Sequence, residues 1–300
     1  MGSRRPGAKE YVLSTRPYSL LNSVSRAIVG GVTAMAVRTG FGAVPAVLTA
    51  LVALGVASFQ AAENLINDYI DTKRGYDTPD APAARLRGHS IFTYGLSLKR
   101  VRDLGLSLLA LGAALVVIAT FALPRPLLPV FLGVGALLLW GYNGRPLELK
   151  YRGLGEVDVF LAALIMVVGS YYTVSGGLGL EPLLLAVPVS LLSTSVALAD
   201  DIRDLEWDRA HGVTTLAVRL GGRPARSLYA ALVLLAVLLP VSLIRPPWGL
   251  LTLATAPLAG AAVLQVWGVR VLSPARAVKL RFYLTMAFSA AYSVAIAMGR

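Results

Sequence analysis

The chain has no cysteine and only two histidines among its 300 residues. Without cysteine there is no disulfide, no catalytic thiolate and no zinc site built from thiolates, and redox chemistry by the protein's own side chains is not expected. His89 and His211 both fall in segments that should form loops. We therefore expect exposed histidine side chains, neither of which acts as a catalytic base.

Charge is also scarce: only 15% of the residues are charged, 56% are hydrophobic, and the mean hydropathy is +0.68. A soluble globule of this length needs a more polar surface than this composition can supply. The composition therefore predicts a protein whose main solvent is lipid.

Uncharged runs long enough to cross a bilayer recur along the whole chain, since a helix needs roughly 20 apolar residues to span the hydrocarbon. They are residues 20–37, 43–66, 104–123, 127–141, 159–174, 182–198, 227–244, 248–267 and 282–298. We expect an all-α, multi-pass bundle of about nine transmembrane helices forming a single domain, residues 1–300.

Most of the basic residues fall on one side of this bundle. Residues 1–18 contain no apolar signal core, so the first span should remain in the mature protein. Of the 28 Lys and Arg residues, 23 lie in the N-terminus and the loops on its side; the others are Arg26, Arg38, Arg125, Arg245 and Arg300. The positive-inside rule places the N-terminus and the long loops in the cytoplasm and the C-terminus outside the cell membrane. The net charge of +12 is then a matter of topology and of anionic lipid, not of nucleic acid.

Two clusters stand out among the acidic residues, residues 64–77 and 200–208, at the cytoplasmic ends of the second and sixth spans. At 100° per residue, each cluster presents one stripe on its helix. The stripes are Asn64, Asp68 and Asp71, and Asp201, Asp204 and Asp208. Asp200 lies about 100° away from the second stripe, so we expect a surface acid or one that acts behind the ligands.

Acids on membrane helices are costly, and several on one face need a shared partner. Carboxylate and amide oxygens suit Mg²⁺, which proteins usually hold together with substrate phosphates, so two facing stripes predict a site for Mg²⁺ and a diphosphate. Two alternatives remain open: helix-end ion pairs with neighbouring basic residues, and a transporter. A transporter would place its charges near the midplane of the membrane rather than at helix ends.

Four fragments in this order resemble the UbiA superfamily of intramembrane prenyltransferases. They are RPYSL (16–20), NDYIDTKRGYDT (67–78), YNGRPLELKYRGLGE (142–156) and DIRDLEWD (201–208), the last followed by GVTTLAVRLG (212–221). The second fragment is similar to the form found among naphthoate prenyltransferases. Those enzymes often begin the later motif with Asn-Asn where this chain has Asp200 and Asp201. The acceptor therefore stays open.

The resemblance implies a bundle around a central cavity, a polyprenyl diphosphate donor, a small aromatic acceptor and Mg²⁺ as cofactor. The metal ligands it implies are Asp68, Asp71, Asp201, Asp204 and Asp208. The implied catalytic residues are Asp68, Asp71, Asp201, Asp204 and Tyr142, with the tyrosine beside an allylic cation. The implied substrate-binding residues are Asn64, Lys73, Arg74, Lys150, Arg203, Arg26 and Asn143.

Arg26 is set apart because it is a lone cation inside the first span. Such a charge is expected to face a cavity, where it meets either an acidic acceptor or the carboxylate of Glu63. Residues 78–99, rich in Pro, Gly and Arg, are expected to form a loop over the cytoplasmic mouth of that cavity.

Within the family, the acceptor could be dihydroxynaphthoate, 4-hydroxybenzoate or, in archaeal lipid synthesis, geranylgeranylglyceryl phosphate. We favour an aromatic precursor of menaquinone or ubiquinone. A CDP-alcohol phosphotransferase is excluded, because its aspartate motif with Asp-Gly and Ala-Arg pairs is missing.

Overall fold

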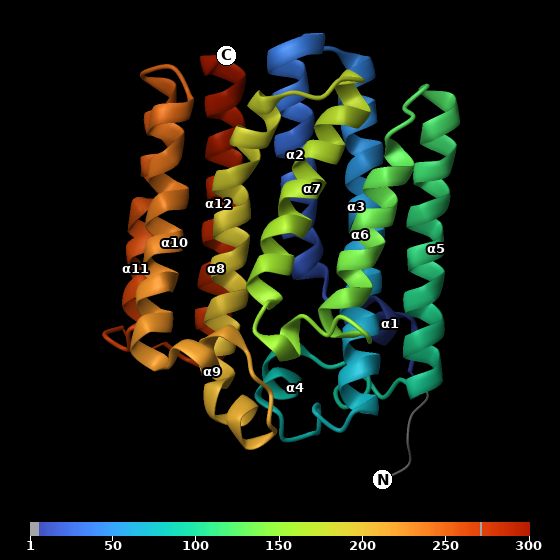
Figure 1. Ribbon diagram of the computed structural model, residues 1–300, viewed down its shortest axis with the longest axis vertical. Coiled ribbons are helices and arrows are strands. Elements are labelled where there is room, and N and C mark those ends of the chain that lie inside the picture. The colour runs from blue at the N-terminus through green and yellow to red at the C-terminus, as the bar shows by residue number, and fades with distance from the viewer. Residues whose placement is uncertain (1–5, 271) are drawn as a thin grey trace.

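The computed structural model describes residues 6–270 and 272–300 (Figure 1). Arg4 and Arg5, which we counted among the cytoplasmic charges, lie outside the described residues. The α-helices are α1 (Ala8–Ser14), α2 (Pro17–Ala34), α3 (Ala43–Lys73), α4 (Pro82–Arg87), α5 (Leu98–Ala122), α6 (Leu128–Asn143), α7 (Gly155–Ser175), α8 (Leu180–Ala210), α9 (Leu216–Leu220), α10 (Gly222–Leu243), α11 (Ala256–Val266) and α12 (Pro274–Gly299). A π-helix (Met35–Thr39) prolongs α2, and two 3₁₀-helices (Lys150–Arg152 and Trp248–Thr255) precede α7 and α11.

The predicted all-α membrane bundle is confirmed. Within the described residues, eight helices are long and apolar enough to cross a membrane, and the shorter apolar helix α6 lies among them (Figure 1). Each of the nine apolar runs corresponds to one of these helices. Proline marks the first turn of α2, α4 and α12, where its missing N–H costs no hydrogen bond, and Gly176 ends α7 in the left-handed conformation.

Two helices, α3 and α8, are longer than the apolar runs predict. Each has 31 residues, or about 46 Å at a helical rise. Helix α3 continues past Asp68 and Asp71 before it ends, and α8 continues past Asp208. The acids therefore lie on regular helix that extends beyond the hydrocarbon, at the lower end of the bundle in Figure 1. Helices α1, α4 and α9 lie at this same end, and the C-terminal end of α12 lies at the opposite one.

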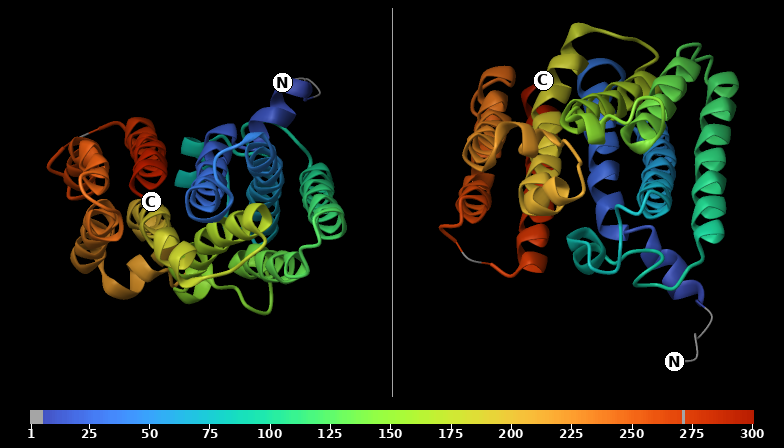
Figure 2. Two further views of the ribbon diagram at one scale, coloured as in Figure 1. Left: turned by 90° about the horizontal axis from the view of Figure 1, so that it is seen from above. Right: turned by 60° about the horizontal axis from the view of Figure 1, so that its bottom comes forward.

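The long helices form a closed ring when viewed along the bundle (Figure 2). Following the chain from α2 through α3, α5, α6, α7, α8, α10 and α11 to α12, each helix packs against the next, and α12 returns to contact α2. Helix α2 also contacts α7 across the ring. The ring is thereby divided into two halves.

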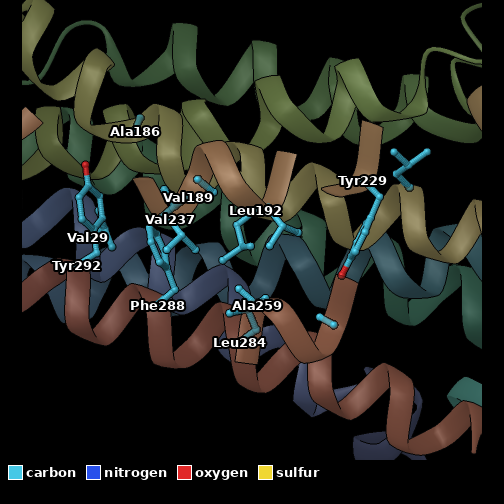
Figure 3. Packing of buried hydrophobic residues seen from close by; sticks show 14 of the residues in the cluster. Val29, Ala186, Val189, Leu192, Tyr229, Val237, Ala259, Leu284, Phe288 and Tyr292 are labelled. Carbon is cyan, nitrogen blue, oxygen red and sulfur yellow. The ribbon is translucent and has the colours of Figure 1, made fainter. Parts of the chain in front are cut away.

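The half that contains α10, α11 and α12 is packed solid. Its core includes Leu192 of α8, Tyr229 and Val237 of α10, and Phe288 and Tyr292 of α12, whose side chains interdigitate in Figure 3. The hydroxyl of Tyr292 donates to the carbonyl of Leu185, so this deeply buried phenol is satisfied. The solid half fixes α8 and α2, which form one wall of a cavity in the other half.

Replacing Gly30 with alanine tests the close approach of α2 and α7. A Cβ atom at Gly30 would lie 2.2 Å from the carbonyl oxygen of Val167 and 2.7 Å from Cβ of Ser170, so the helices would have to separate. We expect Gly30→Ala to lose about 1–3 kcal/mol of stability, measured by thermal unfolding in detergent. The control is Gly133→Ala on α6, which meets nothing within 4 Å and should unfold as the wild type does. Equal unfolding of both variants would contradict this packing.

Candidate active site

The acidic ends of α3 and α8 meet at the mouth of one cavity of about 590 Å³. Asp71 and Asp201 are 130 residues apart in the chain yet line the same space. The acidic residues of the lining are Glu63, Asp71, Asp77, Asp158, Asp200, Asp201, Asp204 and Asp208, and the basic ones are Arg16, Arg26 and Lys150. Acids outnumber bases, so this space carries an excess of negative charge that favours cations.

Asp71 is the best-held acid of the first cluster. Its Oδ2 lies 2.6 Å from Nζ of Lys150, and its Oδ1 accepts a hydrogen bond of 2.7 Å from Nδ2 of Asn143 and another from the hydroxyl of Tyr151. Asn143 also donates to Oδ1 of Asn67 at 2.6 Å. The last residue of α6 and the segment that follows it thus supply these side-chain partners of Asp71, which is why the motif at 142–156 accompanies the acidic one.

Lys150 lies among aromatic rings, with Nζ 4.4 Å from the ring centroid of Tyr76 and 5.5 Å from that of Tyr151. Burial by itself lowers the pKa of Lys150, but the charges of Asp71 and Asp77 raise it further, and the pKa lies above its ordinary value. The ammonium group therefore stays charged at neutral pH. It is a protonated donor that lines the cavity mouth beside the acids.

The position of Asp68 is a correction to the sequence prediction. We expected it in the stripe that faces the metal, but it does not line the cavity, and its relative exposure is 0%. The guanidinium of Arg16 donates to Oδ1, while N and Oγ of Ser90 donate to Oδ2 at 2.9 and 2.7 Å. Asp68 therefore ties α3 to the start of α2 and to the segment after α3.

The residues of the first cluster that line the cavity are Asn64, Asn67, Asp71, Tyr76 and Asp77. Asp77 comes after the end of α3, where the chain has turned back on itself. Its Oδ1 is buried and has no hydrogen-bond partner among the described residues. A buried carboxylate oxygen without a partner is available here as a ligand for a cation that prefers oxygen ligands.

His89 is buried, with a relative exposure of 1%, so the prediction of an exposed side chain was wrong. Its Nδ1 accepts from the backbone N–H groups of Ile91 and Phe92, at 3.1 and 3.4 Å, which leaves Nε2 to carry the proton. Nε2 then lies 3.2 Å from Oδ2 of Asp77 and donates to it. Burial alone would raise the pKa of Asp77, but this hydrogen bond and the nearby cations bring it below its ordinary value.

Asp68, Asp77 and His89 together present ligand atoms within 4.8 Å of one another. This cluster could hold a metal by distance, but Asp68 is already saturated by Arg16 and Ser90, and the neutral imidazole donates a proton rather than a lone pair. We interpret it as a structural hydrogen-bond network. It fixes the predicted loop, which contains the short helix α4, against the end of α3.

In the second cluster, Asp208 and Asp204 are buried and held by neighbours. Asp208 accepts from the hydroxyl of Tyr76 and from Oγ1 of Thr215 at 3.1 Å. Asp204 accepts two hydrogen bonds from the guanidinium of Arg203, at 2.6 and 2.5 Å. Tyr76 and Thr215 come from the loops that follow α3 and α8, so both loops help to orient the acidic end of α8.

Asp201 faces Glu156 of α7, a residue that sequence reasoning passed over. Both oxygens of Glu156 are buried, and a side-chain hydrogen bond joins its carboxyl group to that of Asp201. Two buried carboxyl groups repel each other unless a cation or a proton lies between them. The hydrogen bond between Asp201 and Glu156 places a proton between them, and a bound cation could take the place of that proton.

Asp200 lines the cavity beside the second stripe, within reach of two guanidinium groups. Its Oδ1 lies 2.8 Å from Nη1 of Arg203 and 3.1 Å from Nη2 of Arg281. Asp200 therefore holds basic side chains next to the second stripe, which is one of the two roles that the sequence left open. Arg203 is correspondingly held by Asp200 and Asp204, not extended into the cavity as we expected.

Two further basic residues lie elsewhere than expected. Lys73 is exposed, with Nζ 3.5 Å from the hydroxyl of Tyr69, and Arg74 pairs with Glu148 and stacks over the ring of Tyr151. Neither lines the cavity. Lys73 follows Asp71 by two residues and so lies on the opposite side of α3, whereas Arg74 is held outside the cavity by Glu148 and Tyr151.

The remaining predicted residues, Asn64, Tyr142 and Arg26, all line the cavity. Asn64 uses its amide to donate to the carbonyl of Thr15 at 2.9 Å and to Oγ of Ser19 at 2.8 Å, so it helps to anchor α2.

Behind the acidic mouth the cavity is apolar and opens sideways. Its inner walls come from α3, α5 and α6 and include Val52, Leu115 and Leu132. Leu51 of α3 and Ile118 of α5 line the cavity and are 54% and 63% exposed. An aliphatic chain could pass between these helices into surrounding lipid without leaving an apolar environment.

Fold and site together define an integral membrane protein with an oxygen-rich, negatively charged site at one end and an apolar cavity open to lipid. A model of the UbiA prenyltransferase family matches residues 27–289. The chain belongs to this family and is a prenyltransferase.

Three comparisons illustrate the relationship. The chain is 34% identical over 262 residues to 1,4-dihydroxy-2-naphthoate octaprenyltransferase of Mycobacterium leprae, covering 83% of each chain. It is 32% identical to the enzyme of the same name from Mycobacterium tuberculosis, again over 83% of each chain. Its fold is similar to that of a UbiA homologue from Archaeoglobus fulgidus bound to DMAPP and Mg²⁺, with a TM-score of 0.64, 17% identity, and coverage of 96% of this chain and 99% of that one.

His89→Ala tests whether the buried imidazole holds the segment after α3 in place. Loss of its hydrogen bonds to Asp77 and to the backbone should let this segment open more often, and cleavage by trypsin after the exposed Arg85 should accelerate about tenfold. The measurement is the appearance of the new terminus at Leu86 by mass spectrometry. His211→Ala, at an exposed histidine of another loop, is the control. Cleavage at the wild-type rate in His89→Ala would show that the imidazole does not hold the segment.

Proposed function

We propose that this enzyme moves a polyprenyl group from a polyprenyl diphosphate onto an aromatic acceptor in quinone biosynthesis, and that the reaction depends on Mg²⁺. One observation carries the proposal: oxygen ligands from α3 and α8 face each other at the mouth of an apolar cavity that opens to lipid. This arrangement suits a substrate with a charged diphosphate at one end and a hydrocarbon tail at the other. The naphthoate prenyltransferases among its relatives support the choice of an aromatic acceptor.

The residues present fit Mg²⁺, because the donor set consists of oxygens and Asp77 has a buried oxygen without a partner. The side chains that would hold it are Asn67, Asp71, Asp77, Asp201, Asp204 and Asp208. When bound, Mg²⁺ supplies positive charge that stabilises the departing diphosphate. Asp68 has no place in this set, because its carboxylate already accepts hydrogen bonds from Arg16 and Ser90.

The chain's own groups would then do the following. Lys150, kept protonated by Asp71 and Asp77, donates to diphosphate oxygens as the carbon–oxygen bond breaks and its electron pair leaves with the diphosphate. The apolar lining excludes water, so the allylic cation left behind is not quenched. Tyr142 in the lining offers the face of its ring to that cation. The acceptor ring attacks, a carbon–carbon bond forms, and the ring loses a proton.

We also infer that this site faces the cytoplasm. The acidic mouth shares its end of the bundle with the loops that hold most of the basic residues, and the positive-inside rule assigns that end to the cytoplasm.

Replacing Asp71 with asparagine tests the proposal. The purified protein should transfer radiolabelled geranylgeranyl diphosphate to 1,4-dihydroxy-2-naphthoate or 4-hydroxybenzoate with Mg²⁺ but not with EDTA. Asp71→Asn should lose about 100-fold or more of this activity, because the variant lacks a carboxylate that would hold the metal against the leaving diphosphate.

The control is Lys73→Ala, two residues away on the same helix but outside the cavity, which should retain activity within a fewfold of the wild type. Transfer that persists in EDTA, or an Asp71→Asn variant as active as Lys73→Ala, would refute the proposed site.

A further inference from the structure

Arg26 is held in the middle of the bundle by neutral groups alone. It lies in α2 and lines the cavity, with Nε donating to Oγ of Ser193 at 2.8 Å and Nη1 donating to Oγ of Ser23 at 3.2 Å. The sulfur of Met166 lies 3.9 Å from Nη1. These contacts fix the guanidinium in one orientation without neutralising it.

The other two cations of the cavity are already paired. Arg16 is bound to Asp68, and Lys150 is bound to Asp71. In the part of the chain that the structure describes, no ion pair includes Arg26. A cation inside a membrane span is costly unless it has a partner, and this one has donors left over. A bound anion would complete the site.

The anion for which Arg26 is placed is not the diphosphate at the mouth. Ser193 precedes Asp201 by eight residues on α8, and Met166 follows Asp158 by eight residues on α7. Eight residues of helix span about 12 Å, so Arg26 lies roughly this much deeper in the cavity than the acidic mouth. A prenyl diphosphate anchored at the mouth would have its reactive carbon between the mouth and Arg26.

The surroundings of Arg26 select among anions. Ser23 donates to Gln60, and Gln60 donates to Oε2 of Glu63 at 2.6 Å, so this chain of hydrogen bonds leaves Ser23 to accept from Arg26. No second cation joins Arg26 at this depth in the cavity lining. The guanidinium keeps Nη2 for a ligand and carries one positive charge, which matches one carboxylate, whereas a phosphate dianion would need more positive charge.

We propose that Arg26 binds the carboxylate of an aromatic acceptor and so holds the acceptor ring against the reactive carbon of the donor. This inference rests on the proposed function and refines it. It assigns the acceptor to the aromatic carboxylates rather than to the glyceryl phosphates. It also makes Arg26 the residue that recognises the carboxylate group of the acceptor.

The test compares acceptors with and without the negative charge. Wild type, Arg26→Met and Arg26→Lys are assayed with labelled geranylgeranyl diphosphate and Mg²⁺, offering 1,4-dihydroxy-2-naphthoate, 4-hydroxybenzoate and the two corresponding carboxamides. Arg26→Met should raise KM for the carboxylate acceptors about 10- to 100-fold and leave KM for the carboxamides and for the donor unchanged. Arg26→Lys, which keeps the charge but not the fork, should fall between.

The matched control is Arg38→Met, an arginine beyond the far end of α2 that does not line the cavity. It should behave as the wild type, and thermal unfolding of all variants separates misfolding from weakened binding. An equal rise in KM for carboxylates and carboxamides, or a rise for the donor, would overturn the role of Arg26.

Geranylgeranylglyceryl phosphate serves as a fifth acceptor. Mg²⁺-dependent transfer to it alone would overturn the carboxylate assignment while leaving the metal site standing. No turnover of the donor with any acceptor would overturn the proposed function, and the Arg26 anchor with it.

Discussion

Carboxylates crowded at the ends of two membrane helices repel one another, and the rest of this structure is arranged around that constraint. The chain places Lys150 against Asp71, Arg203 against Asp204, and hydroxyl donors against Asp208. It leaves Oδ1 of Asp77 without a partner among the residues that the structure describes and sets the carboxyl group of Glu156 against that of Asp201. The protein's own cations thus hold the acids in position and stop short of neutralising them. What remains is an excess of negative charge, which a metal cation bound together with an anionic substrate would balance.

The division of the ring into two halves follows from the same need. The solid half, packed around Phe288 and Tyr292, gives α8 a rigid support, while the open half carries the cavity. Loops at the acidic end contribute the orienting groups, with Tyr76, Thr215 and Tyr151 each reaching an aspartate on α3 or α8. Different parts of the chain therefore build the polar mouth and the apolar interior. A substrate with a charged diphosphate and a hydrocarbon tail would occupy both.

The sequence predicted the helices well because lipid imposes one simple requirement, a long apolar run. It also located both acidic ends, since acids on membrane helices are rare. It failed at Asp68, because a helical repeat gives angles between residues but not which face meets the cavity, and Arg16 and Ser90, distant in the chain, decide that. Asp77 and His89 lie beyond the helix, where no period applies, and only long-range contacts reveal that they are buried.

A structure of the purified protein with Mn²⁺ and an unreactive thiolo analogue of geranylgeranyl diphosphate would test the central claim most directly. Our account predicts anomalous scattering from Mn²⁺ between the carboxylates of Asp71 and Asp77 on one side and those of Asp201, Asp204 and Asp208 on the other, with the tail leaving between α3 and α5. Metal bound instead at Asp68 and His89, or a diphosphate bound away from both acidic helix ends, would contradict it.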